Sequence, residues 1–198
     1  MEHFRLFPTH VYIVDNTLNE ETILNIRKHI VSDYELSQEN WQSTPNLHKN
    51  SIYNDLNIKI LANSNLILDK LGYDFDEIII TDMWSNVLKP GESHKVHTHS
   101  NNYISGVFYV DADESSGIVF NDPRPQATII QPFIKNKSVD NANSLKFEAK
   151  TNRLILFPSW LQHYVPVNKT SNNRISLAFN LMLKGKVGNS KEYQSAVF

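Results

Sequence analysis

The chain has 198 residues, of which 40% are hydrophobic and 20% are charged, and its 19 Lys and Arg against 21 Asp and Glu give a formal charge of −2. This composition excludes wholesale disorder, and the near balance of charge gives no general attraction to nucleic acids or anionic membranes. The sequence contains no cysteine, which excludes disulfides, thiolate nucleophiles and cysteine-ligated zinc or iron–sulfur sites. Any metal must therefore bind to His, Asp or Glu.

Two helices are predicted in the first third of the chain. A short strand over residues 10–14 precedes a helix that begins near Thr17, because Thr17 and Glu20 have the spacing of a capping box. A polar loop over residues 37–51 leads to a second helix over residues 55–71, which stops before a glycine.

From residue 75 onward, short runs rich in Ile, Val, Phe and Tyr alternate with turn residues and predict closely spaced strands. Strands without helices between them indicate a sandwich or a barrel. We expect a mainly β (α+β) fold, a double-stranded β-helix or jelly roll with buttressing helices at its N-terminal side. One domain is expected, with residues 1–74 as support, 75–184 as the jelly-roll core and 185–198 as a C-terminal tail. The predicted strands cover residues 77–88, 103–110, 117–120, 128–133, 145–148, 153–157, 163–167 and 174–183.

Three of the 8 histidines, His94, His97 and His99, fall within six positions. Residues two apart on a strand point to the same side, so His97 and His99 could converge on one ion. A third donor must come from elsewhere in the fold, and His163, which opens the strand after an apolar strand, is the best candidate. His94 either replaces His97 as a ligand or, as we expect, borders the entrance to the site.

Arg174 begins the last strand of the predicted core. Alternation places Arg174 and Ser176 on one face of that strand and Ile175 and Leu177 on the other. A guanidinium inside the mouth of a barrel needs a partner, because burying an unpaired charge is very costly. The carboxylate of a bound ligand is a natural partner, since it accepts two parallel hydrogen bonds from Arg.

The region from about Trp84 to Leu183 resembles one group of small 2-oxoglutarate- and Fe(II)-dependent oxygenases, some of them phage-encoded. The wider family pattern is His-x-acid, a distal His, an Arg about ten residues later, and a polar residue two positions beyond. Four motifs carry the resemblance here: His97-Thr-His99-Ser-Asn101-Asn102-Tyr103-Ile-Ser105-Gly106-Val-Phe-Tyr109, Phe120-Asn-Asp122-Pro123, Leu156-Phe-Pro158-Ser159-Trp160-Leu-Gln-His163, and Arg174-Ile-Ser176.

The resemblance implies an oxidoreductase, specifically a dioxygenase and most simply a hydroxylase. Such an enzyme couples the oxidative decarboxylation of 2-oxoglutarate to succinate with the oxidation of a C–H bond by O2, with ascorbate as an accessory reductant. The resemblance implies Fe(II) held by His97, His99 and His163. It also implies that 2-oxoglutarate chelates the iron through its C1 carboxylate and keto oxygen, while its C5 carboxylate pairs with Arg174, helped by Ser176.

Strand alternation and the motifs suggest further residues around this site. Asn86 and Tyr109 are expected to contact 2-oxoglutarate. The candidates for the substrate pocket and its surroundings are His94, Asn102, Tyr103, Ser105 and Trp160.

One position departs from the commoner family pattern, because His99 stands where Asp or Glu usually follows the first His. Imidazole suits Fe(II), so we expect His99 to be a ligand, and the alternative is a two-His site that 2-oxoglutarate and water complete. Two other functions stay open, a cupin-like three-His iron dioxygenase that does not use 2-oxoglutarate and a non-catalytic jelly-roll binding module. Arg174 favours the 2-oxoglutarate oxygenase over the cupin-like dioxygenase, because an oxygenase without a co-substrate carboxylate has no need of that guanidinium, whereas the binding module predicts no metal affinity.

The expected substrate is a small molecule or a peptide, and we expect no nucleic-acid or membrane partner. No apolar stretch approaches the roughly 20 residues that span a bilayer. The first residues lack the basic and apolar segments of a secretory signal, so a cytoplasmic location is expected. A jelly-roll edge or the helices could pair two copies in a homodimer.

Overall fold

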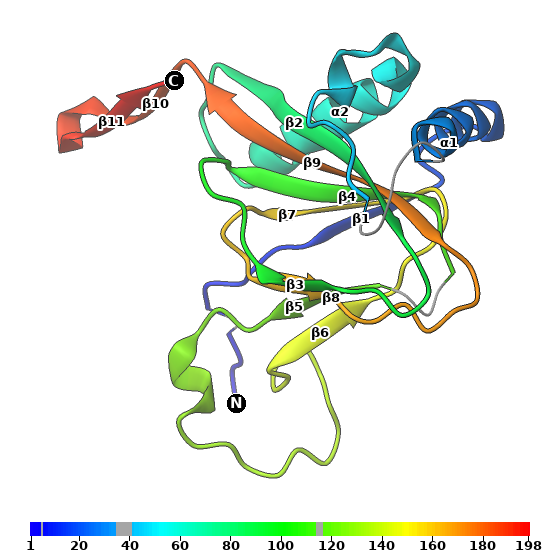
Figure 1. Cartoon of the computed structure of the whole chain (residues 1–198). Coiled ribbons are helices and arrows are strands. Elements are labelled where there is room, and N and C mark those ends of the chain that lie inside the picture. Colours follow the sequence, from blue (N-terminus) through cyan, green and yellow to red (C-terminus); the bar gives the residue numbers. More distant parts are fainter. Residues whose placement is uncertain (5, 35–40, 114–116) are drawn as a thin grey trace.

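The computed structural model describes residues 1–4, 6–34, 41–113 and 117–198. Two antiparallel sheets face each other, and two helices cover the outer face of the larger sheet (Figure 1). The larger sheet has the strand order β1-β7-β4-β9-β2 and the smaller one the order β3-β8-β5-β6, which confirms the predicted jelly roll with buttressing helices. The elements are β1 (Tyr12–Asp15), α1 (Glu20–Tyr34), α2 (Asn54–Lys70), β2 (Glu77–Leu88), β3 (His94–His97), β4 (Ile104–Asp111), β5 (Ile118–Asn121), β6 (Ser144–Phe147), β7 (Arg153–Pro158), β8 (His163–Val165), β9 (Arg174–Lys184), β10 (Lys186–Asn189) and β11 (Gln194–Val197).

Alternation along β9 divides the side chains of the larger sheet between two layers. Ile175, Leu177 and Phe179 pack with the helices in the larger hydrophobic core. Arg174 and Ser176 point the other way and line the space between the sheets. Successive strand residues face opposite sides, so this one strand contributes both to the core and to the cavity, as the sequence pattern predicted.

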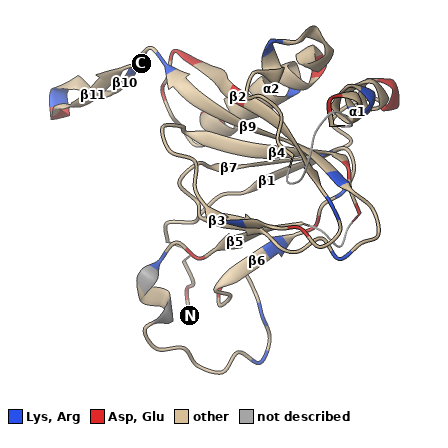
Figure 2. Ribbon diagram, in the orientation of Figure 1, with Lys and Arg blue, Asp and Glu red and all other residues tan. Residues whose placement is uncertain are grey.

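The helices cover the larger sheet through single apolar stripes. Charged residues lie mainly on the helices, at strand ends and in the connections, while the middle of the larger sheet carries few of them (Figure 2). Burial of apolar surface is worth roughly 25 cal/mol per Å², so the stripes hold the helices to the sheet. Their buried residues are Ile23, Ile26 and Ile30 on α1 and Leu56, Ile60, Ile67 and Leu68 on α2.

The start of α1 differs from the predicted capping box. Asn19 caps this helix, because its side-chain oxygen accepts a hydrogen bond of 2.8 Å from the backbone N–H of Thr22. The Thr17 hydroxyl instead donates to the carbonyl of Val14 at 3.2 Å. The Asn19 amide satisfies one of the free N–H groups of the first turn, so the helix begins at Glu20 rather than near Thr17.

The second helix ends where the glycine predicted it. Gly72 adopts a positive φ of 73°, and the N–H of the following Tyr73 bonds back to the carbonyl of Leu68 at 3.1 Å. Positive φ is the conformation that glycine adopts without strain, which explains the stop. Residues 37–40 of the loop predicted between the helices lie outside the described residues, and its last part forms two 3₁₀ turns, Leu47–Lys49 and Ser51–Tyr53.

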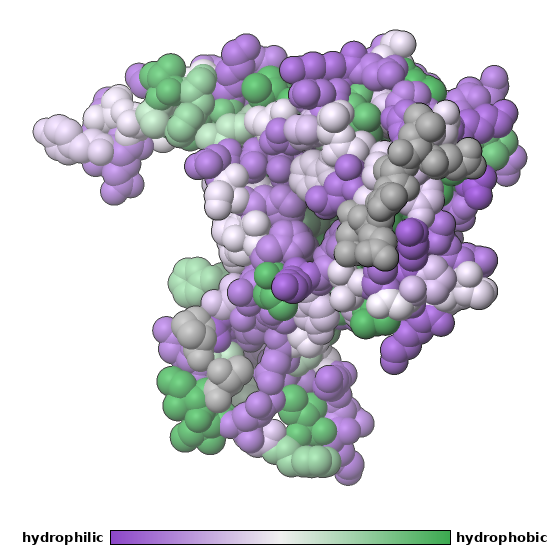
Figure 3. Space-filling view, viewed as in Figure 1, coloured by the Kyte–Doolittle hydropathy of each residue, from purple (hydrophilic) through white to green (hydrophobic). Residues whose placement is uncertain are grey.

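The predicted strand over residues 128–133 is wrong. A 3₁₀ turn covers Pro125–Thr128, and Ile129 and Ile130 are then 77% and 84% exposed. High strand propensity does not by itself make a segment pair with another strand. Here β5 pairs directly with β6, and the segment between them is left without a partner strand. This long connection carries hydrophobic side chains on the lower surface in Figure 3.

Two further segments form strands that were not predicted. β3 is short and pairs with β8 in the smaller sheet. The C-terminal tail forms the hairpin of β10 and β11, which extends away from the two sheets (Figure 1) and is tied to them where the carboxylate of Asp76 accepts a 2.9 Å hydrogen bond from the Lys186 N–H. Among the helices of the described ranges, none has the length and apolar character needed to cross a bilayer.

Candidate metal centre and co-substrate cavity

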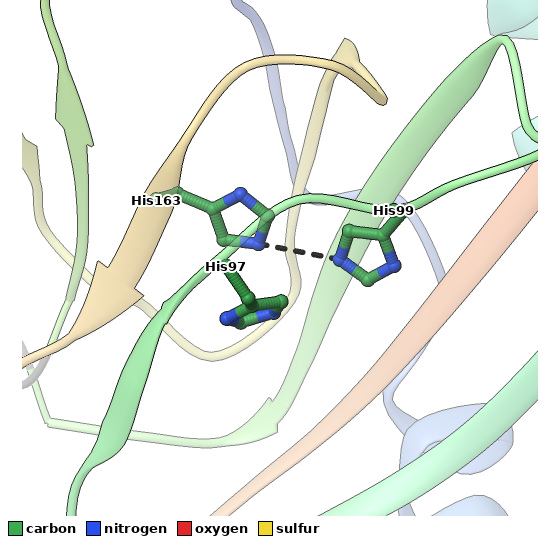
Figure 4. A group of neighbouring side chains, drawn as sticks. All are labelled: His97, His99 and His163. Atoms are coloured by element: carbon green, nitrogen blue, oxygen red, sulfur yellow. Dashed lines mark hydrogen bonds between the residues drawn. The ribbon is translucent and has the colours of Figure 1, made fainter.

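Three imidazoles converge at one point between the sheets. His97 ends β3 and lies directly opposite His163, which begins β8, so their ring centroids are 4.3 Å apart. His99 follows in the connection to β4, and its Nε2 lies 3.3 Å from Nε2 of His163 (Figure 4). One ligand nitrogen from each ring lies within 4.8 Å of the other two.

The convergence of His97 and His99 does not come from strand alternation, which was the basis of the prediction. β3 ends at His97, and His99 lies beyond the strand. The backbone N–H of His99 bonds to the carbonyl of Ser159 at 2.9 Å, which ties this connection to the turn after β7. A tertiary hydrogen bond therefore brings His99 to the other two rings.

Hydrogen bonds orient two of the rings. Nδ1 of His163 lies 2.9 Å from the carbonyl of Leu161, and Nδ1 of His97 lies 2.7 Å from the carbonyl of Lys95. A carbonyl only accepts, so each Nδ1 carries a proton, and in the neutral form of each ring the lone pair is on Nε2. This is the arrangement by which backbone carbonyls commonly fix the tautomer of metal-binding imidazoles.

Burial keeps two of the imidazoles neutral. Desolvation lowers the pKa of His99 to about 4, with a smaller contribution from His97, and it also lowers the pKa of His163 to about 4. Only a neutral imidazole can donate a lone pair to a metal. Two nitrogens bound at right angles, each about 2.1 Å from an ion, lie about 3 Å apart, close to the observed separation of His99 and His163. The three residues thus fit a divalent transition metal.

Arg174 lines the same cavity as the histidines. Its side chain is 3% exposed, and its guanidinium lies 5.8 Å from the ring centre of Tyr109. Burial lowers the pKa of Arg174, since the charged form is poorly solvated there. Among the described residues no Asp or Glu lines this cavity, whereas Arg174 and Lys95 both do. The cavity therefore has the charge that suits an anionic ligand.

Three predicted neighbours of Arg174 also line the cavity. Ser176 is two residues further along β9 and pairs with Asn86 on β2. The Oδ1 of Asn86 accepts a 2.7 Å hydrogen bond from Gln42, which leaves its NH2 group as the part that can donate to a ligand. Burial raises the pKa of Tyr109 to about 12, so its phenol keeps a proton to donate.

His94 is the remaining predicted residue that lines the cavity, at the start of β3. Burial lowers the pKa of His94, and the nearby charge of Arg174 lowers it further. The cavity has a volume of about 400 Å³, within the range of roughly 300–1,000 Å³ usual for small-molecule sites.

The structure places four predicted residues away from this cavity. Asn102 bonds to Thr81 at 2.7 Å, and Ser105 is buried between strands, where it bonds to Ser159 and Asn180. Tyr103 and Trp160 line a separate aromatic groove beside Tyr73. Tyr103 and Ser105 share the parity of His97 and His99, but parity has no meaning across the irregular connection between β3 and β4, because alternation holds only within a strand.

Sequence reasoning missed other residues of the cavity. Trp84, whose ring centre lies 5.9 Å from that of His99, shares the cavity face of β2 with Asn86, and alternation could have placed it there. Gln42 reaches the cavity from a segment joined to β2 by an isolated bridge, for which the sequence holds no signal.

Residues 82–180, half of the chain, match the model of the family described as "Putative 2OG-Fe(II) oxygenase". The chain belongs to this family. The enzyme class expected from the motifs is thereby confirmed, together with the cofactors of the family, Fe(II), 2-oxoglutarate and O2.

Solved structures share the fold at low sequence identity. HygX from Streptomyces hygroscopicus, with nickel and 2-oxoglutarate bound, has a TM-score of 0.65 at 11% identity over 88% of this chain and 83% of its own. A prolyl-4-hydroxylase from Pseudomonas putida has a TM-score of 0.61 at 12% identity over 89% of both chains. The viral collagen prolyl hydroxylase of Paramecium bursaria Chlorella virus 1 has a TM-score of 0.55 at 14% identity, over 86% of this chain and 94% of its own. No curated protein matches the sequence.

Proposed function

We propose that this oxygenase holds Fe(II) on His97, His99 and His163 and hydroxylates a C–H bond of a small-molecule substrate. The observation that carries the proposal is the meeting of three imidazoles in the cavity that also contains the buried Arg174. When bound, iron and 2-oxoglutarate supply the oxidising chemistry, in which 2-oxoglutarate, O2 and R–H give succinate, CO2 and R–OH.

The co-substrate anion is proposed to bind at the Arg174 end of the cavity. The guanidinium can offer two parallel donors to the C5 carboxylate, and the Ser176 hydroxyl on the same strand face can offer a third. Asn86, held by Gln42, presents its NH2 group to the same space. Hydrogen bonds to a carboxylate are strong where water is excluded, so these residues would orient the co-substrate with respect to the histidines.

The histidines supply the metal end of the site. The carbonyls of Leu161 and Lys95 hold the protons on Nδ1 of two rings and direct each Nε2 lone pair to the metal. Three neutral ligands compensate less of the charge of Fe(II) than the usual two His and one carboxylate, which strengthens the attraction of the site for anions. We infer that the positive charge of the metal site and the positive charge of the cavity around Arg174 act together to bind the dianionic co-substrate.

The proposal is tested by coupled measurements on the whole protein. Anaerobic titration with Mn(II), with and without 2-oxoglutarate, should show metal binding that tightens in the presence of the co-substrate. With Fe(II), ascorbate and O2, the protein should release succinate and CO2 in equal amounts, and candidate small molecules should stimulate that release. Product formation that does not consume 2-oxoglutarate would indicate a cupin-like three-His dioxygenase, and a failure to bind any metal would indicate a binding module.

A further inference from the structure

One turn contacts both His99 and His163. It comprises residues 158–161, from the last residue of β7 onward, and is closed by a 2.9 Å hydrogen bond from the Leu161 N–H to the Pro158 carbonyl. The carbonyl of Ser159 accepts the backbone N–H of His99 at 2.9 Å. The carbonyl of Leu161 accepts Nδ1–H of His163, also at 2.9 Å. The relative placement of the two imidazoles therefore depends on where this turn sits.

A buried chain of side-chain hydrogen bonds fixes the turn to the larger sheet. Ser105 donates to Oδ1 of Asn180 at 2.8 Å, and the hydroxyls of Ser159 and Ser105 are 2.8 Å apart. A hydroxyl has one proton, and that of Ser105 goes to Asn180, so Ser159 must be the donor to Ser105. The direction is thus from Ser159, in the turn after β7, to Ser105 on β4 and on to Asn180 on the neighbouring β9.

The location of this hydrogen-bonded chain distinguishes its role from that of ordinary core packing. All three side chains are buried, and none of them lines the cavity or reaches the imidazole nitrogens. The backbone of the same turn is also held, because the N–H of Ser159 bonds to the carbonyl of Tyr103 at 3.1 Å. The backbone bond and the hydroxyl are two separate attachments of the turn, so loss of the hydroxyl would free its rotation and with it the directions of its two carbonyls.

We propose that the chain Ser159–Ser105–Asn180 positions the two imidazoles, so that Ser159 is a positioning residue for the metal site. This proposal rests on the proposed function, since it takes His99 and His163 as metal ligands. Loss of the Ser159 hydroxyl would let the turn rotate and would spread the two Nε2 atoms from their present separation of 3.3 Å. Residues that orient metal ligands in this way typically contribute about 10–100-fold to metal affinity.

The test compares Ser159→Ala with two controls in the whole protein. Ser64→Ala removes another fully buried serine hydroxyl, on α2, which has no hydrogen-bond partner among the described residues. Ile26→Val trims the buried core between α1 and the sheet and lowers the melting temperature without touching the turn. Co(II) serves as the metal, and the readouts are its dissociation constant, its visible absorption spectrum and, in the metal-free protein, hydrogen exchange at the His99 amide.

Ser159→Ala should raise the dissociation constant of Co(II) by at least tenfold, change the absorption spectrum and speed exchange of the His99 amide by a similar factor. Both controls should keep the wild-type constant and spectrum. Ser105→Ala breaks the same chain at its centre and should give the same pattern, which keeps the test decisive if Ser159→Ala folds poorly. Wild-type affinity and exchange in the serine variants, or equal loss in Ile26→Val, would overturn the proposal.

The two proposals fail in distinguishable ways. If the wild-type protein bound no metal, the proposed function would fail, and exchange of the His99 amide in the metal-free protein would still decide whether Ser159 holds this segment. If the wild type bound metal and Ser159→Ala bound it equally well, only the positioning role would be lost.

Discussion

Replacement of Arg174 by Met separates co-substrate binding from metal binding. Arg174 is 3% exposed and lines the cavity from the start of β9 in the larger sheet. His97 and His163 lie on the smaller sheet, and His99 lies in the connection after β3. Methionine fills most of the same volume but offers no charge and no donor. We therefore expect 2-oxoglutarate to bind far more weakly, while Mn(II) binds with unchanged affinity.

The expected size of the effect follows from the burial of Arg174. Truncating one partner of a buried, hydrogen-bonded charge pair costs about 2–5 kcal/mol. A loss of about 3 kcal/mol, at about 1.4 kcal/mol per factor of ten, weakens 2-oxoglutarate binding about 100-fold. Arg174→Lys keeps the charge but loses the planar fork, so a loss of about tenfold is expected.

Calorimetry and thermal unfolding give independent measurements of this change. Anaerobic titration of the Mn(II)-loaded protein gives the dissociation constant of 2-oxoglutarate directly. At a concentration of about 100 times the wild-type constant, the ligand adds about 2.7 kcal/mol to wild-type stability but only about 0.4 kcal/mol to that of Arg174→Met. The melting temperature of the variant should therefore hardly respond to 2-oxoglutarate.

Arg27→Met is the matched control, because it also removes one positive charge but from an exposed ion pair of α1 with Asp111. It should leave 2-oxoglutarate affinity unchanged, since exposed pairs contribute little and act over short distances in salt. Equal 2-oxoglutarate affinity in wild type and Arg174→Met would refute the assignment of Arg174 to the co-substrate. Parallel losses of Mn(II) and 2-oxoglutarate affinity would show that the variant disturbs the fold instead.

Three further predictions concern the ligands, the two faces of β9 and the effect of pH. His163→Ala should abolish Mn(II) binding. His99→Asp restores the commoner family pattern, so its Mn(II) affinity should stay within about tenfold of the wild-type affinity. If His99→Ala bound Mn(II) as well as the wild type does, His99 would not be a ligand. Ser176→Ala should weaken the binding of 2-oxoglutarate about tenfold in calorimetry, with little change in stability. Leu177→Ala, one residue further on, should lower the free energy of unfolding in urea by about 2–5 kcal/mol and leave 2-oxoglutarate binding unchanged. The reverse pattern would contradict the alternation of the two residues between the cavity and the core. The pKa of His99 and of His163 is lowered to about 4 in the folded protein. Between about pH 6.5 and 4 the unfolded chain therefore binds more protons than the folded one. The stability of the metal-free protein should fall as the pH is lowered through this window. Urea unfolding at pH 7 and pH 4.5 should show a smaller pH-dependent loss for His163→Gln than for wild type, and equal losses would show that His163 is not buried as a neutral ring.

Local patterns in the sequence were enough to predict the architecture and much of the site. Apolar alternation on the strand of Ile175 and Leu177 required Arg174 and Ser176 to face away from the core, because neighbouring strand residues point to opposite sides. The spacing of apolar residues likewise predicted both helices, and Gly72 ended the second where positive φ is needed. These features depend on residues close together in the chain, so the sequence could predict them.

Only the tertiary structure decided which polar residues meet and which do not. His99 joins His163 through a backbone bond to Ser159, 60 residues away along the chain, and Ser105 turned out to belong to that support rather than to the cavity. The segment after Pro125 has strand-forming residues but no partner strand, so it does not become a strand. Hydrogen bonds between distant segments depend on the register and spacing of whole sheets, and a local pattern contains no information about either.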